Sequence, residues 1–372
     1  MPDILTNDAH VIQVINTLEP AGAERVAVDL ALASCAAERK TSVFSLHGGP
    51  LQAVLEDAGI PIHLGAADEN ILGAVMRLAR LTKEHPTVIV HSHLIRSNLI
   101  ARTASLIARP TALIETQHDT YKRPLWASAY RYATRARVSA TVACSPRVAD
   151  YVNTVMRVPQ GRLQIIENGV DTQTYSQGAG PWHRPPVVGS IGSLLEVKRY
   201  DVLLKAFAEI LKHDRPVKLI LFGEGAARTL LQTLIEELGI AHAVSMPGVA
   251  LDVPAALREL DVFVQPHVRS SVGMSIMEAM AAAKPVIIGV DEGFILAPAA
   301  PTAALFESGD VAELSSCLGE LLLHPEKARQ VGELSQDWVR SERTSKAAAA
   351  RYLDLYDELT RKSARRSRPQ ES

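Results

Sequence analysis

The sequence lacks the features that mark a disulfide-rich, zinc-binding or membrane-spanning protein. Its three cysteines, Cys35, Cys144 and Cys317, are far apart and odd in number, so no disulfide framework or structural zinc site is expected. No apolar run approaches the roughly 20 residues that a membrane span needs. The first ten residues, MPDILTNDAH, have no basic region of the kind that opens a secretory signal. We therefore expect a cytoplasmic protein with reduced thiols.

The chain also lacks a strong charge of either sign. It carries 39 Lys and Arg against 41 Asp and Glu, and its formal net charge is -2. This balance is typical of a soluble globular protein and provides no general attraction for nucleic acid. Any site for an anion must therefore be local. A chain of 372 residues is too long for one ordinary core, so two domains of roughly 150 to 200 residues each are expected.

What the sequence does contain is a regular alternation of short apolar runs and longer helical patterns. In the first half, strands are predicted at 10–18, 41–46, 87–93, 111–118 and 140–145, and helices at 23–38, 51–59 and 97–108. In the second half, strands are predicted at 186–194, 217–225, 261–266 and 284–290, and helices at 200–213, 227–239 and 274–283. This alternation predicts an α/β fold with βαβ units and buried parallel sheets.

A break between the halves sets the predicted domain boundaries. The stretch SQGAGPWHRPP, residues 176–186, collects Gly, Pro and polar residues as a linker does. We predict an N-terminal domain at 1–178 and a C-terminal domain at 187–345. Residues 346–372 would form a helix, which could pack back on the N-terminal domain, and a basic, disordered tail. A ligand is expected in a cleft where the carboxyl ends of the two sheets face each other.

Seven short motifs follow one another in an order that resembles a known family. They are EPAGAERVA at 19–27, HSH at 91–93, TQHD at 116–119, ENGVD at 167–171, GSLLEVKRYDVLLKAF at 192–207, LFGEG at 221–225 and GMSIMEAMAAAKPVI at 273–287. Over about residues 11–360 the chain resembles the retaining glycosyltransferases of family 4. The resemblance implies the GT-B fold, in which two Rossmann-like domains face each other across an interdomain cleft. It also implies a nucleoside-diphosphate sugar as donor substrate and no metal or other cofactor.

The resemblance places a ribose-binding and a sugar-binding residue around the last motif. The family carries two glutamates eight positions apart, and Glu278 occupies the second position, which holds the ribose hydroxyls. A carboxylate near a helix N-terminus gains from the helix dipole and suits a vicinal diol. The simpler alternative is a first-turn acid that only stabilises its own helix. Ser270 stands in place of the first glutamate, which contacts the transferred sugar. Its hydroxyl can bind a sugar but supplies no negative charge to the transition state.

Candidate groups for the diphosphate come from two loops. Gly273, Met274 and Ser275 precede or open the predicted helix, and their backbone amides are candidate donors to a phosphate or sugar oxygen. A plain tight turn would use a glycine equally well. The family neutralises the diphosphate with cationic side chains, and Lys198 falls on its phosphate-binding lysine.

Two further positions lie in the motif at 192–207. One departs from the family, and the other has two possible roles. Ser193 replaces the customary arginine. Arg199 could compensate for that loss, or it could be a solvated charge at the head of the following helix.

The first half provides a glycine turn and a histidine. Gly22 follows the first predicted strand, where a glycine lets the backbone approach a ligand, although any strand-to-helix turn could use one. His118 follows the strand at 111–118 and matches the family histidine beside the transferred sugar and leaving phosphate. Its implied role is positioning and charge stabilisation, without acting as a base. A histidine at a strand end can also be a packing or capping residue.

The HSH motif carries two more histidines. His91 and His93 should face the same side of their strand. The sequence offers no third metal ligand nearby, so a structural or acceptor-side role is preferred to a metal site.

The function implied by the resemblance is transfer of a sugar to a glycan, a lipid-linked acceptor or a small molecule, with retention of configuration. The C-terminal domain would bind the nucleotide and the N-terminal domain the acceptor, and no nucleic acid is expected. The alternative from another class is a non-catalytic sugar-nucleotide-binding subunit, motivated by the losses at Ser270 and Ser193. An epimerase or phosphorylase on the same fold is less favoured, because the ordered motifs are those of the transferases.

A basic and aromatic segment, residues 121–138, raises the question of membrane contact. This composition suits the surface of an anionic membrane and would place the protein peripherally at the inner face. The alternative is a helix with one packed aromatic side and one solvated basic side. The residues concerned are Lys122, Arg123, Trp126, Tyr130, Arg131, Tyr132, Arg135 and Arg137.

Overall fold

The computed structural model describes residues 9–66, 69–120, 125–175, 180–213, 216–268, 272–291 and 302–366. The chain divides into two compact units, Met1–Asn168 with Ser345–Ser372, and Gly169–Thr344. The second unit begins earlier than the linker composition predicted. Val170 and Tyr175 are buried in its core, and Val170 forms a parallel bridge with Thr344. The boundary differs because buried apolar contacts, and not the Gly and Pro content of 176–186, fix where a unit starts.

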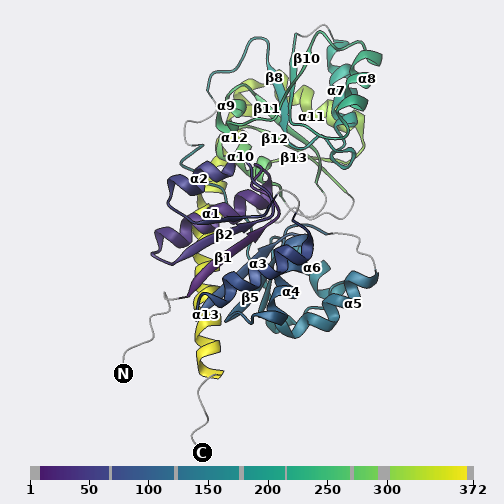
Figure 1. Cartoon of the computed structure of the whole chain (residues 1–372). Helices are drawn as coiled ribbons and strands as arrows, with labels where there is room; N and C mark the ends of the chain where they lie inside the picture. Colours follow the sequence, from purple (N-terminus) through teal and green to yellow (C-terminus); the bar gives the residue numbers. More distant parts are fainter. Residues whose placement is uncertain are drawn as a thin grey trace, which may run out of the picture. The chain divides into compact units, whose positions relative to one another are not determined.

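The first unit is built on a seven-stranded parallel sheet with strand order β3-β2-β1-β4-β5-β6-β7. Figure 1 labels β1, β2 and β5 of this sheet. Its strands are β1 His10–Ile15, β2 Thr41–Ser45, β3 Ile62–Leu64, β4 Val88–His93, β5 Ala112–Gln117, β6 Ala140–Ala143 and β7 Leu163–Ile165. Its helices are α1 Gly22–Ala36, α2 Leu51–Asp57, α3 Ile71–Lys83, α4 Ile95–Ile107, α5 Leu125–Thr134, α6 Pro146–Thr154 and α13 Ser345–Arg366, with short 3-10 turns at Arg135–Arg137 and Gln160–Arg162.

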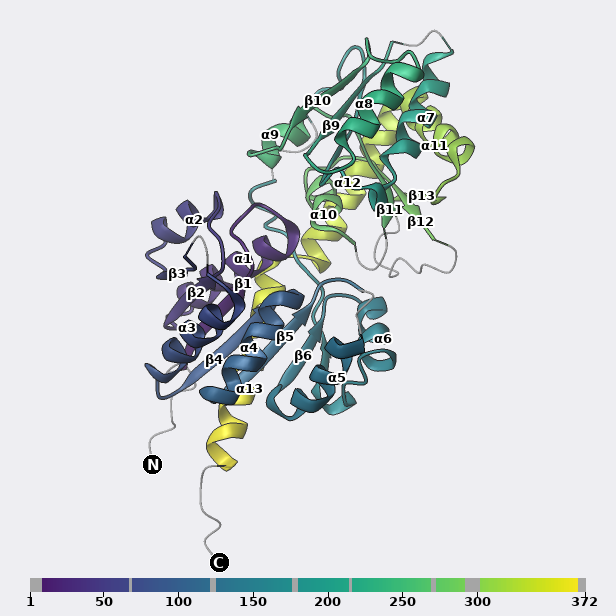
Figure 2. The same cartoon turned by 45° about the vertical axis from the view of Figure 1, so that its right-hand side comes forward.

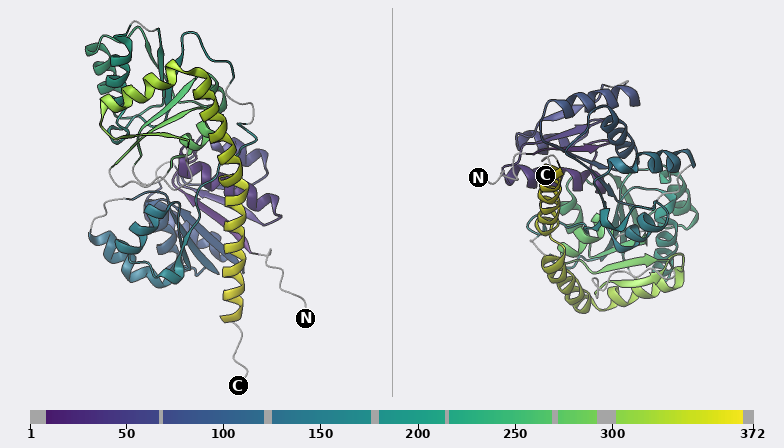
Figure 3. Two further views of the ribbon diagram at one scale, coloured as in Figure 1. Left: turned by 180° about the vertical axis from the view of Figure 1, so that it is seen from behind. Right: turned by 90° about the horizontal axis from the view of Figure 1, so that it is seen from below.

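Helices cover both faces of this sheet, and the alternation of side chains along β1 shows how. Ile12 and Val14 belong to one buried cluster that includes residues of α3 and α4, which pack side by side (Figure 2). Ile15 belongs to a second cluster with residues of α1 and α2. Gln13 contacts Tyr356 of α13, which packs against α1 and runs along the sheet in the view from behind (Figure 3). Successive residues of a strand point to opposite faces, so β1 must be apolar on one side and can carry a polar residue toward α13.

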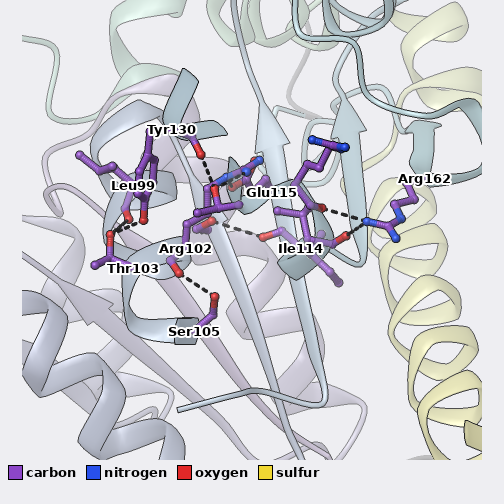
Figure 4. A network of polar contacts seen from close by, with 12 residues as sticks. Leu99, Arg102, Thr103, Ser105, Ile114, Glu115, Tyr130 and Arg162 are labelled. Atoms are coloured by element: carbon purple, nitrogen blue, oxygen red, sulfur yellow. Dashed lines mark hydrogen bonds and ion pairs between the residues drawn. The ribbon is translucent and has the colours of Figure 1, made fainter. Parts of the chain in front are cut away.

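A buried ion pair connects the layer of α4 to the sheet (Figure 4). Arg102 of α4 donates through Nε and Nη2 to the two carboxylate oxygens of Glu115 on β5, and Glu115 is fully buried. Arg102 Nη1 also donates to Thr134 Oγ1 over 3.1 Å, at the end of α5. A buried charge is tolerated only when its partner and further hydrogen bonds replace water. The pair therefore fixes α4 and the end of α5 against β5.

The second unit has a six-stranded parallel sheet of order β10-β9-β8-β11-β12-β13. Its strands are β8 Val187–Ile191, β9 Lys218–Phe222, β10 Val244–Gly248, β11 Val262–Val268, β12 Val286–Val290 and β13 Ala304–Glu307. Its helices are α7 Tyr200–Leu211, α8 Arg228–Glu237, α9 Val253–Arg258, α10 Met274–Ala281, α11 Val311–Leu323 and α12 Pro325–Glu342, with a 3-10 turn at Glu196–Lys198. Two buried clusters, one containing Leu203 and Phe207 and the other Ile276 and Met280, make up its core.

The structure can be compared with the expectations about cysteines, membrane-spanning segments and metal sites. All three cysteines are free thiols. Within the described ranges, no helix combines the length and apolar character that crossing a bilayer requires. The same residues contain no group of three His, Cys, Asp or Glu side chains placed to hold a metal ion. The expectation that the chemistry needs no metal stays a prediction.

Candidate active site

The strand order of the second unit brings its two predicted donor motifs to one place. β8 pairs with β11, and Val188 and Gly189 lie opposite Val262 and Phe263. β9 pairs with β8 on its other side, so the chain order reverses between β8 and β11. Ligands of open parallel sheets bind at such a reversal, beyond the carboxyl ends of the strands. The loop after β8 leads to Lys198, and the segment after β11 leads to Glu278, so both leave neighbouring strand ends.

The loop after β8 is held by the LFGEG motif, which the sequence analysis used only as a landmark. Gly192 N donates to Phe222 O, and Leu194 N donates to Glu224 O, each over 2.9 Å. A Cβ on Gly223 would lie 1.9 Å from Gly192 O, and one on Gly225 would lie 2.3 Å from Leu194 O. The two glycines therefore allow the loops after β8 and β9 to touch backbone to backbone. Both positions therefore require glycine, and the two closely spaced glycines of the motif could have indicated such a backbone contact.

The cationic part of this loop is shaped by an unusual backbone. Arg199 has φ 54 and ψ 37, the left-handed conformation, directly before α7. Its Nε lies 3.2 Å from Asp201 Oδ1, and its guanidinium lies close to Gly309, where an added Cβ would be 3.6 Å from Nη1. The Arg199 side chain is 41% exposed, so the alternative of a solvated charge at the head of α7 holds in part, with Asp201 as its ion-pair partner. Lys198 is half-buried one residue earlier, and Ser193 is exposed in the same loop.

The segment after β11 presents its backbone amides at the start of α10. Gly273 caps α10 with φ -64 and ψ 154, and a Cβ there would meet no described atom within 4 Å. The fold of the described residues therefore does not itself require glycine at this position. Ile276 N and Met277 N both bond to Gly273 O, which leaves Met274 and Ser275 as the helix-opening amides with no intrahelical acceptor.

Glu278 was expected near the N-terminus of this helix, and the alternative made it a first-turn acid. The helix α10 begins at Met274, as predicted, and Glu278 is its fifth residue, just beyond the first turn. The helix dipole acts mainly within the first turn, so its gain at Glu278 is small. The alternative interpretation, an acid that merely stabilises its own helix, is weakened for the same reason. Glu278 is half-buried, and Ser270 lies outside the described residues.

In the first unit, Gly22 opens α1 directly after the β1 loop, as predicted. Ala21 occupies the N-cap without a side-chain hydrogen bond, and both residues are exposed. The first-turn amides of α1 therefore lack a side-chain cap. Glu24, in that first turn, is 6% exposed, and burial raises the pKa of its carboxyl. Glu24 was not among the predicted site residues, and its only signal in the sequence was an acid on the apolar side of a predicted helix.

His118 lies immediately after β5 and joins two other histidines. Its Nε2 is 3.0 Å from His93 Nδ1, and the two ring centroids are 5.3 Å apart. His91 and His93 lie on the same side of β4, as predicted, with ring centroids 4.3 Å apart. No pattern in the sequence indicated that these two residues would lie beside His118. The contact arises because β4 and β5 are paired neighbours.

Burial keeps these three rings neutral at physiological pH. It lowers the pKa of His91 to about 3 and, with smaller contributions from His91 and His118, lowers the pKa of His93 well below its ordinary value. His118 keeps part of its surface accessible, yet crowding by protein atoms lowers its pKa to about 4 against a smaller opposing effect of Asp119. A neutral His118 can orient a ligand but supplies no full positive charge. This neutral state belongs to the protein without its donor, so the charge-stabilising part of the expected role stays a prediction.

Comparison with known families identifies the class of the protein. A family model described as Glycosyltransferase Family 4 matches residues 20–174, and one described as Glycosyl transferases group 1 matches residues 171–338. The chain belongs to the family 4 glycosyltransferases. Its two Rossmann-like units are those of the GT-B fold. The protein is therefore a glycosyltransferase.

Individual relatives agree with this assignment. EpsD of Bacillus subtilis, named as a glycosyltransferase, is 26% identical over 305 residues, which cover 76% of this chain and 80% of that protein. A GDP-mannose-dependent alpha-(1-6)-phosphatidylinositol monomannoside mannosyltransferase of Mycolicibacterium smegmatis is 26% identical over 219 residues, 53% of this chain and 56% of that one. The crystal structure of HepE from Anabaena with UDP and glucose has a TM-score of 0.79 at 19% identity, and covers 93% of this chain and 98% of HepE.

Proposed function

We propose that this glycosyltransferase moves a sugar from a nucleoside-diphosphate donor to its acceptor with retention of configuration. The observation that carries the proposal is the convergence of two distant motifs on neighbouring strand ends of the second unit. That arrangement supplies a cation, Lys198, and a carboxylate, Glu278, at the edge where parallel sheets bind nucleotides. HepE, whose fold is similar, has been crystallised with UDP and glucose.

Each group then has a distinct task in binding the donor. Lys198 would neutralise the diphosphate as the glycosidic bond breaks, helped by the amides of Met274 and Ser275. Glu278 would accept hydrogen bonds from the ribose hydroxyls. Gly273, which the described fold does not need as a glycine, would leave room for the phosphate or sugar. Arg199 contacts Asp201 and lies by Gly309, so it would hold the loop in shape more than it would touch the donor.

Two measurements test this proposal. A panel of UDP, GDP, ADP and their sugar conjugates should include one that raises the Tm, since a ligand at 100 times its Kd adds about 2.7 kcal/mol to the free energy of unfolding. UDP and GDP come first, because HepE was crystallised with UDP and the mannosyltransferase depends on GDP-mannose. Proton NMR of the first-formed product then reports its anomeric configuration. An inverted anomer would contradict retention.

A second candidate is a sugar-nucleotide-binding subunit without its own turnover. Ser193 and Ser270 favour it, because they stand where the family carries a cation and an acid. The experiment compares wild type with Ser270→Glu against the stabilising donor and a panel of acceptors. Transfer by the wild type would exclude the subunit role. Nucleotide binding with no transfer, followed by transfer in Ser270→Glu, would favour it.

We further propose that the acceptor is lipid-linked and that the protein meets an anionic membrane through the end of α5. Tyr132 is 63% exposed, and the Arg135 guanidinium lies 3.7 Å from its ring centroid. Tyr130, in contrast, turns inward and its hydroxyl lies 2.7 Å from Thr103 Oγ1. The mycobacterial mannosyltransferase acts on a phosphatidylinositol mannoside, as its name states. The side chains of Lys122, Arg123, Trp126 and Arg131 lie outside the described residues.

A further inference from the structure

A chain of buried hydrogen bonds in the first unit connects α13 to His118. Tyr356 of α13 contacts Gln13 on β1, Gln13 contacts His93 on β4, and His93 contacts His118 after β5. The distances are 3.0 Å from Gln13 Nε2 to Tyr356 Oη, 3.0 Å from His93 Nε2 to Gln13 Oε1, and 3.0 Å from His93 Nδ1 to His118 Nε2. A branch leads from Tyr356 Oη to His91 Nδ1 at 2.7 Å, and from His91 Nε2 to Thr116 Oγ1 at 2.8 Å.

The Gln13 amide sets the direction of every bond in this chain. Its Oε1 can only accept, so His93 Nε2 must carry the proton and His93 Nδ1 must be an acceptor. His118 Nε2 must then carry a proton and donate to His93. On the other side, Gln13 Nε2 donates to Tyr356 Oη, and Tyr356 can donate its own proton to His91 Nδ1. The chain requires a neutral His93, because one of its ring nitrogens must accept while the other donates. Neutral His91 and His118 are compatible with the same bonds.

Burial supports the same protonation states. Gln13, His91 and His93 are fully buried, and Tyr356 is 0% exposed. Burial raises the pKa of the Tyr356 hydroxyl far above physiological pH, despite its hydrogen bond from Gln13, so that this group keeps its proton. Buried polar side chains are held in one hydrogen-bonding arrangement, because water cannot replace a hydrogen bond that breaks.

We propose that Gln13, His93 and Tyr356 are positioning residues that hold His118 as the neutral Nε2–H tautomer. In that state Nδ1 of His118 keeps its lone pair and can accept a hydrogen bond from a substrate hydroxyl. A ring free to exchange tautomers would present this acceptor only part of the time. The effect on catalysis rests on the proposed function. The tautomer itself does not, because it is a property of the free protein.

Histidine-selective ¹⁵N NMR of the full chain tests the tautomer without any substrate. The His118 signals are assigned by their loss in His118→Gln. At pH 7.5 the expected pattern is a pyrrole-type Nε2 and a pyridine-type Nδ1. A protonated Nδ1 in the wild type would overturn the proposal, and this measurement needs no variant of the buried chain to fold.

Tyr356→Phe and Tyr352→Phe form a matched pair of variants. Both tyrosines lie on α13 and are at most 2% exposed. Each substitution removes one hydroxyl. Tyr352 contacts Thr116 Oγ1 at 3.3 Å and has no contact with Gln13 or His93 among the described hydrogen bonds. Tyr356→Phe removes the acceptor that orients the Gln13 amide, so His118 should become a mixture of tautomers. Tyr352→Phe should leave the wild-type pattern.

Kinetics with the donor found by the nucleotide panel provides the second readout. Tyr356→Phe should lower kcat about tenfold with KM and the Kd of UDP or GDP within twofold, whereas Tyr352→Phe should change kcat less than twofold. An unchanged tautomer in Tyr356→Phe, or equal effects of the two substitutions, would overturn the role of Tyr356. If no donor supports transfer, the proposed function fails, and the NMR result still decides the tautomer.

Discussion

At the residue scale, the proposed donor site combines a half-buried cation, Lys198, and a half-buried acid, Glu278, from two separate segments. Lys198 ends a 3-10 turn before α7, and Glu278 lies in the second turn of α10. The helix dipole explains neither position. Lys198 is a cation before the N-terminus of α7, where the dipole favours an anion, and Glu278 lies beyond the first turn of α10. Their value in binding therefore depends on direct contact with the donor.

Removing either side chain should weaken nucleotide binding. Lys198→Ala and Glu278→Ala should each reduce the affinity for the stabilising nucleoside diphosphate by roughly 1.5 to 3 kcal/mol, the range for hydrogen bonds to charged groups. Isothermal titration calorimetry measures the change. Lys212→Ala, which removes an exposed lysine just after α7, is the control and should bind as the wild type. Unchanged Kd values in both site variants would eliminate this donor site.

His118 should act on turnover more than on binding. A group placed beside the reacting carbon contributes mainly in the transition state, so His118→Ala should lower kcat by roughly tenfold to a hundredfold and leave nucleotide Kd within a few-fold. Steady-state kinetics and calorimetry provide the two values. His242→Ala, at an exposed site in the second unit, controls for the loss of a histidine. Equal kcat in wild type and His118→Ala would reduce His118 to a structural residue.

At the element scale, short loops position the site because glycines let their backbones touch. Gly223 and Gly225 follow β9 and press on the loop that follows β8. Arg228 of α8 reinforces the arrangement, since its Nη1 lies 2.6 Å from Glu224 and its Nη2 donates to Met246 O over 2.8 Å. The strand ends at the sheet edge are thus connected before any ligand binds.

Substituting one of these glycines should damage both stability and binding. In Gly223→Ala the new Cβ would meet the Gly192 carbonyl at 1.9 Å, so the β8 loop must move. We expect a loss of roughly 2 to 4 kcal/mol in the free energy of unfolding and a weaker nucleotide Kd. Gly239→Ala is the control: its φ is also positive, at 70, but no atom lies within 4 Å of its Cβ position. It should cost about 1 kcal/mol in stability and leave the Kd unchanged.

The end of α5 should determine membrane binding if the acceptor is lipid-linked. Arg135→Ser with Arg137→Ser should abolish most co-sedimentation with vesicles of anionic phosphatidylglycerol, because each basic residue near such a surface adds about 1 kcal/mol. Wild-type binding should fall as salt rises. Lys205→Ser with Lys212→Ser removes the same charge from exposed sites on and just after α7. If the wild type stays in the supernatant at low salt, a soluble acceptor is indicated.

At the scale of the whole molecule, the buried histidines should make the protein sensitive to acid. The pKa of His91 is lowered from 6.5 to about 3 by burial, so the folded state binds fewer protons than the unfolded state between these values. Stability from the neutral ring is complete above pH 6.5 and is lost as the pH falls toward 3. The same direction holds for His93.

Denaturation by urea at two pH values measures this linkage. When the pH falls from 7.5 to 5.5, the free energy of unfolding of the wild type should decrease by about 1.4 kcal/mol more than that of His91→Asn, which no longer carries the titrating group. His242→Asn should follow the wild type, because its side chain is exposed. Parallel pH dependence in wild type and His91→Asn would show that His91 is not the source.

The sequence by itself determined the alternating pattern of strands and helices, and through its ordered motifs the family. Strands β1, β4, β5, β8, β9, β11 and β12 are buried apolar runs, so periodicity found them. The edge strands β3, β7, β10 and β13 were missed, because they have only three to five residues and are partly exposed. Lys198 and Glu278 were recognisable because the residues around each form a contiguous motif.

Only the tertiary structure decided which of these residues meet. Gln13 and Tyr356 are separated by 343 positions, and nothing local to either residue indicates the other. Their contact exists because α13 packs against the face of the sheet to which Gln13, His91 and His93 point. The same holds for the unit boundary at Gly169, which depends on where Val170 is buried. A pattern of period two or 3.6 identifies a buried face, but which segment covers that face is settled by packing between distant parts of the chain.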